Sequence, residues 1–503
     1  MRLSVTPVAS CAALVLNLAL TGLVAAQQAW QFPFALTHDG QVLGSVEGEI
    51  ASFKGLAYAA PPVGPLRWRP PQGLPDGSEM RTAYDYGPPC PQSAMPRASE
   101  DCLTLNVFRP FGVDGPLPVM VFIHGGGFVA GTANDPLFDG ARLAQAGVIV
   151  VTLNYRLGAL GWLVHPALAA DDPGGPVGNY GMMDQIAALR WIHDNAAAFG
   201  GDPHNVTLFG AGAGATSIAL LMLCEQSRGL FQKAILQSLP ARERVRSLPE
   251  AETVGQRLLG LVARGNRAVE PRAADASRLM AAERLLLAKS SQSFAPTLDG
   301  RLVREDIARG FGAGHESRIP LIIGSNADET SFVSAPDLGE ELRFVGESAD
   351  AVKTRYPDAA DRPETLAARL YTDRVFSEPA RLIARLHAAA GPATFRYRFA
   401  YVPEMQRASA EGGHGRELQF IFGTQGVPGA VPLTRADREL GNLLRGYWTN
   451  FARTGDPNGQ GLPHWDASAP GDRLLAITNE RVSSGDDPLS QTLDRLERRS
   501  PKG

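Results

Sequence analysis

The sequence predicts an α/β fold in which a mostly parallel central sheet is flanked by helices. Short buried strands alternate with helical segments along most of the chain, the order expected when successive strands run in the same direction. The clearest strand is 148–153, a β-branched run typical of a strand buried on both faces. The clearest helix is 183–199, where apolar residues recur at helical spacing.

The other elements follow in order along the chain. Up to about residue 115, short strand-like runs alternate with proline-rich loops. Apolar runs then predict strands at 118–123, 206–209, 234–237, 321–324 and 395–401. A helix is expected at 216–223, directly after a glycine-rich turn. Helical regions at 250–289 and 349–390 are expected to form lobes over the carboxyl edge of the sheet.

Length, charge and the N-terminal segment restrict the class of protein. The chain has 503 residues and a net charge of −4, so no general attraction to nucleic acid is expected. Arg2 is followed by an apolar run, 11–24, and then by small residues, a pattern typical of an export signal. We expect a signal peptide at 1–26, a single domain at 27–503, and a periplasmic or secreted protein after cleavage near Ala26. No membrane span is expected, and the oligomeric state stays open.

The expected export bears on the state of the cysteines, because exported proteins fold in an oxidising compartment. Cys90 and Cys102 are close together in a proline-rich stretch, and an oxidising compartment favours a disulfide between them. Cys224 is then unpaired and is expected to be a small buried residue. No spacing of cysteines and histidines indicates a metal site, and we expect no cofactor.

A glycine-rich turn follows the 206–209 strand. In the G-x-S-x-G motif a sharp strand-to-helix turn presents the nucleophilic serine of a hydrolase. The corresponding turn here runs from Gly210 to Gly214, and its centre is Gly212, which has no hydroxyl. The turn is thus of the right kind, but its nucleophile is missing.

A second glycine run, His124 to Phe128, follows the 118–123 strand. Such a run lets backbone N–H groups converge on a developing oxyanion, as in HGGG-type loops. We expect Gly126 and Gly127 to be two donors and the N–H of Ala213 to be the third. A flexible loop is the alternative, and the position directly after an apolar strand favours the oxyanion loop.

A base and an acid complete the chemistry of acyl transfer. His414 lies in a glycine-rich turn, and Glu329 follows the 321–324 strand, with Asp328 as its competitor. A lone loop histidine usually faces water. The order of Gly212, acid and histidine, however, is the chain order of nucleophile, acid and base in α/β-hydrolases.

Together these motifs resemble the type-B carboxylesterases, the cholinesterase-like branch of the α/β-hydrolase fold, from about residue 35 to 480. The matching stretches are Phe53–Trp68, Glu100–Asn106, Asn154–Gly158, Phe199–Pro203 and Phe294–Gly300. The resemblance implies an α/β-hydrolase fold with helical lobes over an active-site gorge. It also implies a Cys90–Cys102 bridge, Glu329 as the triad acid and His414 as the base.

The same resemblance places the family's serine on Gly212. It therefore implies a carboxylic ester hydrolase, whereas Gly212 implies that this copy is inactive or nearly so, because loss of the serine costs on the order of 10⁶ in kcat. Thr216 lies within the following helix and is not expected to replace it. The retained His414 and Glu329 favour a recent natural loss or an engineered knock-out. Non-catalytic adhesion proteins also exist in this family, so a binding protein is the alternative.

The turn also satisfies the dinucleotide fingerprint G-x-G-x-x-G/A through Gly210, Gly212 and Ala215. That fingerprint requires an acidic residue about twenty positions further on, at the end of the next strand. Here that strand ends at Gln237, and the first acid beyond it is Glu243. We therefore do not expect a nucleotide to bind.

Arg242, Arg244 and Arg416 are the candidate substrate-binding residues. A solvated surface loop is the favoured alternative, because charged clusters usually face water. If the arginines line the gorge, they would bind carboxylates through paired hydrogen bonds. Exported bacterial type-B esterases that remove tricarballylate from fumonisins are a precedent. The expected partner is accordingly a small-molecule ester, bulky or carboxylate-bearing.

Overall fold

The computed structural model describes residues 32–499, except for 76, 78, 94, 114, 171–176, 264–269, 290–293, 334, 408–412 and 469–471. The signal peptide expected at 1–26 lies outside the described residues, so export stays a prediction. Among the residues that are described, no helix is both long and apolar enough to cross a membrane.

One large sheet forms the centre of the molecule, with the strand order β16-β15-β14-β13-β10-β9-β7-β8-β6-β4-β3. Its parallel part consists of β15 (Arg473–Ile477), β14 (Thr394–Phe399), β13 (Leu321–Asn326), β10 (Lys233–Gln237), β9 (Gly201–Ala211), β7 (Leu117–Ile123) and β8 (Ile149–Leu153). The antiparallel edges are β6 (Thr104–Pro110), β4 (Ile50–Ala57) and β3 (Ser45–Glu47) on one side and β16 (Val482–Asp486) on the other. The prediction of a mostly parallel sheet is confirmed.

Strand β7 shows why the sheet has a core on each face. Val119, Val121 and Ile123 belong to one hydrophobic cluster, whereas Met120 and Phe122 belong to another. Successive side chains of a strand point to opposite faces, so a continuous apolar run fills both cores. The first core takes in α5 (Tyr180–Asn195) and α6 (Ala213–Leu223), and the second takes in α2 (Ala141–Ala144), α14 (Arg416–Phe422) and α15 (Arg435–Thr454).

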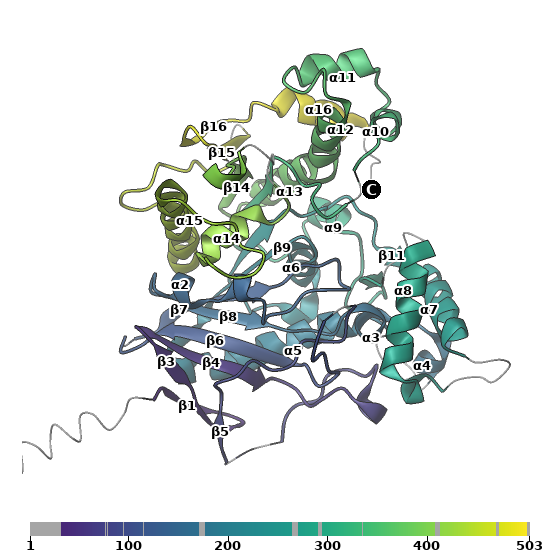
Figure 1. Ribbon diagram of the computed structural model, residues 1–503, viewed down its shortest axis with the longest axis vertical. Helices are drawn as coiled ribbons and strands as arrows, with labels where there is room; N and C mark the ends of the chain where they lie inside the picture. Colours follow the sequence, from purple (N-terminus) through teal and green to yellow (C-terminus); the bar gives the residue numbers. More distant parts are fainter. Residues whose placement is uncertain are drawn as a thin grey trace, which may run out of the picture.

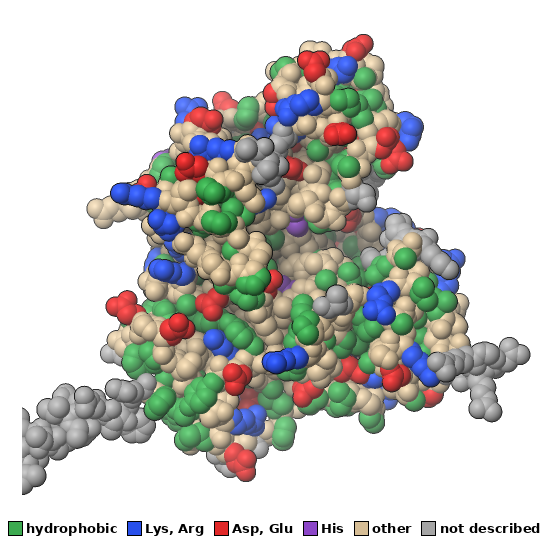
Figure 2. Space-filling view, in the orientation of Figure 1, with side chains coloured by type: hydrophobic (Ala, Val, Ile, Leu, Met, Phe, Trp, Pro, Cys, Tyr) green, Lys and Arg blue, Asp and Glu red, His purple; other side chains and the backbone are tan. Residues whose placement is uncertain are grey.

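Two helical lobes extend from the sheet (Figure 1). One contains α7 (Leu248–Val262) and α8 (Ala276–Lys289). The other contains α10 (Leu338–Val345), α11 (Ala349–Arg355), α12 (Pro363–Thr372), a π-helix (Asp373–Ser377), α13 (Glu378–Ala389) and α16 (Ser490–Arg499), and has a small core of its own. Figure 2 shows a hollow in the surface between the two lobes.

The remaining elements are short. A small sheet contains β1 (Phe34–Thr37), β2 (Gly40–Leu43) and β5 (Met80–Thr82), and β11 (Arg246–Ser247) pairs with β12 (Thr297–Leu298). The short α-helices are α3 (Gly158–Trp162), α4 (Pro166–Ala170) and α9 (Ile307–Ala313). Single 3₁₀ turns are Gly64–Leu66, Pro136–Phe138, Ala196–Phe199, Glu225–Ser227, Pro271–Ala273 and Glu404–Gln406. The expected Cys90–Cys102 disulfide is present, and Cys224 is free and buried.

Candidate active site

The turn between β9 and α6 places Gly212 at the carboxyl edge of the sheet. Gly212 has φ 56° and ψ −116°, a conformation that a residue with a Cβ adopts only at a steric cost. Its N–H donates to the carbonyl of Gln237 at the end of β10 (3.0 Å). A Cβ at Gly210 or Gly214 would lie 2.5 or 2.0 Å from the carbonyl oxygen of Ile123. The outer glycines are therefore required because the end of β7 passes against the turn.

The vacant side-chain position of Gly212 faces His414. A Cβ at Gly212 would lie 2.6 Å from His414 Nε2 and 3.2 Å from Cε1. The ring thus presents its Nε2 to the point from which a nucleophilic side chain would extend.

The other ring nitrogen of His414 is held by Glu329. His414 Nδ1 donates to Glu329 Oε2 at 2.6 Å, and the Glu329 side chain is fully buried. The second oxygen of this carboxylate accepts from Ser238 Oγ and from the N–H of Asn326, both at 2.6 Å. Asp328 instead accepts from the N–H and hydroxyl of Thr330. Glu329, and not its competitor, therefore orients the ring.

The surroundings of His414 favour its charged form. Burial lowers its pKa, but the charge of Glu329 and the hydrogen bond to it outweigh burial, so the pKa is raised above the ordinary 6.5. Glu417, a buried carboxyl beside Glu329, acts in the same direction. A base of this kind is neutral only above its raised pKa.

The three expected oxyanion donors lie around one cavity. Gly126, Gly127 and Ala213 line it together with Gly212 and His414. Among the described residues, neither Gly126 nor Gly127 donates its N–H to a protein acceptor. A Cβ at Gly126 would lie 2.1 Å from the carbonyl oxygen of Ala130, so the tight loop requires glycine there.

His124, at the start of this segment, is packed in the interior of the protein. Its ring is buried and stacks on Tyr155, with the ring centroids 4.5 Å apart. Burial lowers the pKa of His124 to about 4, so the ring is neutral. Tyr155 donates its hydroxyl to the carbonyl of His124 (2.9 Å). These contacts indicate a structural role.

The cavity has a volume of about 510 Å³, and its wall includes Phe128, Phe332 and Phe376. Phe332 and Phe376 lie against His414, with ring centroids 4.4 and 5.6 Å away. Phe376 belongs to the π-helix, a feature often found at functional sites. Within the described part of the chain the wall contains one carboxyl, Glu243, and no lysine or arginine.

None of the candidate substrate-binding arginines lines this cavity. Arg242 donates Nε and Nη2 to Glu378, both at 2.5 Å. Arg244 pairs with Glu250 on the exposed surface, and Arg416 donates to Gln406. Each of the three side chains has a partner within the protein. For Arg244, whose side chain is 63% exposed, the geometry is that of a solvated loop.

Some residues of the site carry no motif in the sequence. Ser238, Phe332 and Phe376 belong to three different segments that meet only in the folded chain. A π-helix cannot be read from periodicity. The only available signal was Ser238, which directly follows the 234–237 strand at the carboxyl edge.

Comparison with known proteins gives the same picture. Residues 31–494 match the model of the carboxylesterase family. The fumonisin B1 esterase of Sphingopyxis macrogoltabida is 36% identical over 92% of this chain and 90% of its own length. The para-nitrobenzyl esterase of Bacillus subtilis (strain 168) is 34% identical over 92% and 97%. Neuroligin-2 of Mus musculus is 34% identical over 85% of this chain, which spans only 61% of that protein.

Solved structures agree. A PNB esterase structure matches with a TM-score of 0.80 at 32% identity, covering 92% of this chain and 99% of that one. The carboxylesterase of Geobacillus stearothermophilus matches with a TM-score of 0.80 at 31% identity and the same coverage. The chain therefore belongs to the carboxylesterase family and has its α/β-hydrolase fold.

Proposed function

We propose that this chain is a carboxylic ester hydrolase of the Ser-His-Glu type whose nucleophile position is occupied by Gly212. It would bind esters but cleave them slowly or not at all. One observation carries the proposal. A Cβ at Gly212 would lie 2.6 Å from His414 Nε2, while Glu329 accepts a hydrogen bond from Nδ1 of the same ring.

The arrangement supports each step of acyl transfer except nucleophilic attack. An ester carbonyl in the cavity would meet the N–H groups of Gly126, Gly127 and Ala213, which are suited to a developing oxyanion. His414 would take the proton of a nucleophile and return it to the leaving alcohol. Without a hydroxyl at 212, there is no group from which His414 can take that proton.

A water molecule is a poor substitute for the serine. The His414 ring already lies within van der Waals range of the space above Gly212, because its Nε2 is 2.6 Å from the Cβ position. Water between the two would require the ring to withdraw. We therefore propose that the chain as it stands is a binding form of the enzyme.

Bulky esters are the substrate class that we propose. The cavity of about 510 Å³ has phenylalanine side chains in its wall, and these suit a large apolar group. The relative from Sphingopyxis macrogoltabida is a fumonisin B1 esterase. Fumonisin-type esters are therefore the first bulky substrates to try, alongside simple aryl esters.

A non-catalytic binding protein is the second candidate. The similarity to neuroligin-2, 34% identity over 85% of this chain, favours it. In that case the protein would act by binding a partner through its surface, and Gly212→Ser would confer no ester hydrolysis.

The two candidates are separated by one pair of proteins, the chain with Gly212 and its Gly212→Ser variant. Both are incubated with an aryl ester and, separately, with a fluorophosphonate label. Hydrolysis and labelling that occur only in the serine variant support the esterase. Their absence from a folded serine variant contradicts it and favours the binding protein.

A further inference from the structure

A second, smaller cavity of about 240 Å³ adjoins the catalytic one. Glu243 lines both cavities, so the two cavities meet at this residue. The smaller cavity is also lined by Arg242, Arg374 and Arg499. We call it the arginine pocket. The catalytic cavity, by contrast, has no cationic residue other than His414 among the described residues of its wall.

Two of the three guanidinium groups are fixed by buried carboxylates. Arg242 uses Nε and Nη2 to bind Glu378, and Arg374 uses Nε and Nη2 to bind Glu341, at 2.8 and 2.7 Å. Each pair engages one edge of the guanidinium group, and a guanidinium group has five N–H donors. Donors on the remaining edge of each side chain stay available to a ligand.

The third guanidinium group, that of Arg499, differs from the other two in its partners. Within the described part of the chain, no carboxylate forms an ion pair with it. It lies near the end of α10, where its Nη1 is 2.6 Å from the Cβ position of Gly346. Arg242 and Arg374 each have a carboxylate partner of their own, so Arg499 is the lining arginine whose charge is available to an anion.

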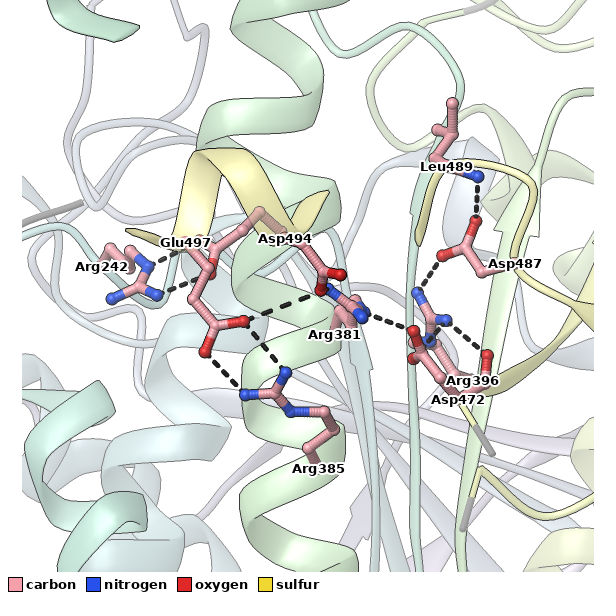
Figure 3. A network of polar contacts seen from close by, with 10 residues as sticks. Arg242, Arg381, Arg385, Arg396, Asp472, Asp487, Leu489, Asp494 and Glu497 are labelled. Atoms are coloured by element: carbon pink, nitrogen blue, oxygen red, sulfur yellow. Dashed lines mark hydrogen bonds and ion pairs between the residues drawn. The ribbon is translucent and has the colours of Figure 1, made fainter. Parts of the chain in front are cut away.

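Helix α16, which carries Arg499, is anchored by a network of ion pairs (Figure 3). Arg381 of α13 binds Asp494 at 2.7 Å, and Arg385 binds Glu497 at 2.6 Å. Arg381 also binds Asp472, which ties the same network to the start of β15. The network therefore fixes α16 against α13 and sets the position of Arg499 at the pocket.

Glu243 is the acidic side chain among the described residues that line the arginine pocket. Burial raises the pKa of its carboxyl, while the charge of Arg374 lowers it, and the net shift is upward. This upward shift means that the Glu243 carboxyl holds its proton more readily than an ordinary glutamate, which weakens its repulsion of an anion.

We propose that the arginine pocket is a subsite for a free carboxylate carried by the ester substrate. This inference rests on the proposed function and specifies its substrate class. The reactive ester lies at Gly212 and His414, and a carboxylate several bonds away passes Glu243 to reach Arg242, Arg374 and Arg499. Apolar side chains of the pocket, among them Phe344 and Leu496, would contact the intervening chain.

The chain with Gly212 allows a direct binding test, because an uncleaved ester can be titrated. The probes are aryl monoesters of dicarboxylic acids of increasing length, each compared with its methyl diester by calorimetry. At the optimal length we expect the acid to bind roughly tenfold more tightly than the diester at low salt, with a smaller difference at high salt.

Arg499→Gln should remove most of that preference while leaving the affinity for the diester unchanged. Arg498→Gln is the matched control, because Arg498 lies on the same helix and lines a neighbouring surface groove rather than the arginine pocket. Melting curves of the two variants should coincide. An equal loss of preference in both would indicate a diffuse positive field and overturn the subsite.

Other outcomes separate this inference from the proposed function. Equal affinity for acid and diester at every length overturns the subsite but leaves ester binding intact. Free adipate that binds as tightly as the tethered carboxylate would make the pocket a site for free anions, and also overturns the subsite. If neither ester binds and Gly212→Ser is inactive, the proposed function fails as well.

Discussion

Restoring the nucleophile with Gly212→Ser tests the geometry of the site quantitatively. A Cβ at this position would lie 2.6 Å from His414 Nε2, and ordinary contact begins at 3.4 Å, so the ring must withdraw by about 0.8 Å. Loss of a triad serine costs on the order of 10⁶ in kcat, and a misplacement of about 1 Å can cost about 10². We therefore expect kcat to rise by between about 10⁴ and 10⁶.

The same substitution should lower stability. Serine at φ 56° and ψ −116° has a Cβ in a strained conformation, which costs about 1–3 kcal/mol. Gly212→Ala shares this strain but has no hydroxyl, so it is the matched control. Both variants should melt a few degrees below the chain with Gly212.

The assay combines aryl ester hydrolysis, fluorophosphonate titration of active sites and thermal melts of all three proteins. Activity in Gly212→Ala equal to that in Gly212→Ser would refute the role of the hydroxyl. A chain with Gly212 that melts below Gly212→Ser would refute the strain argument. A folded serine variant that takes up no label would show that His414 does not act as its base.

Four further outcomes are expected. In the Gly212→Ser background, Glu329→Gln should lower kcat by about 10⁴ with little change in KM, because the ring loses the partner that fixes its tautomer. The kcat/KM of Gly212→Ser should fall as the pH drops through the pKa of His414, which is raised above 6.5. Glu329→Gln should move this acid limb of the pH profile to lower pH. Protonated His414 stabilises the fold fully below pH 6.5, and this contribution is lost as pH rises through the raised pKa; urea unfolding of a His414→Gln variant measures the loss. Arg244→Gln should leave the Kd for anionic and neutral esters unchanged, because its pair with Glu250 is exposed, and a selective loss for anionic esters in the calorimeter would contradict this.

The sheet was predictable because its strands are continuous apolar runs. The run at 148–153 became β8 (Ile149–Leu153), with every residue buried between two cores.

The start of α6 was less predictable. The sequence indicated a helix from Thr216, whereas α6 begins at Ala213. Gly214 is a poor helix former, but a Cβ there would lie 2.0 Å from the carbonyl oxygen of Ile123, so packing overrides propensity.

The site was predictable only where chain order carried information. The order of Gly212, Glu329 and His414 is a pattern along the sequence. The partner of Arg242 could not be predicted from such a pattern, because Glu378 lies 136 residues away on α13. A sequence shows that an arginine is present, but not which carboxylate satisfies it. The geometry therefore moves Arg242 from the catalytic cavity to the pocket beside it.

The retention of a base and an acid without a nucleophile also has a structural cause. Glu329 accepts hydrogen bonds from His414, Ser238 and Asn326 in a fully buried position, and so ties the ends of β10 and β13 to the turn of the base. Leaving a buried donor unpaired costs about 1–3 kcal/mol, so replacing Glu329 would destabilise the fold whether or not the site is active. Gly126 is fixed in the same way by its approach to the carbonyl of Ala130. Selection for stability alone can thus preserve these residues after the serine is lost, so their presence does not show that the loss was recent.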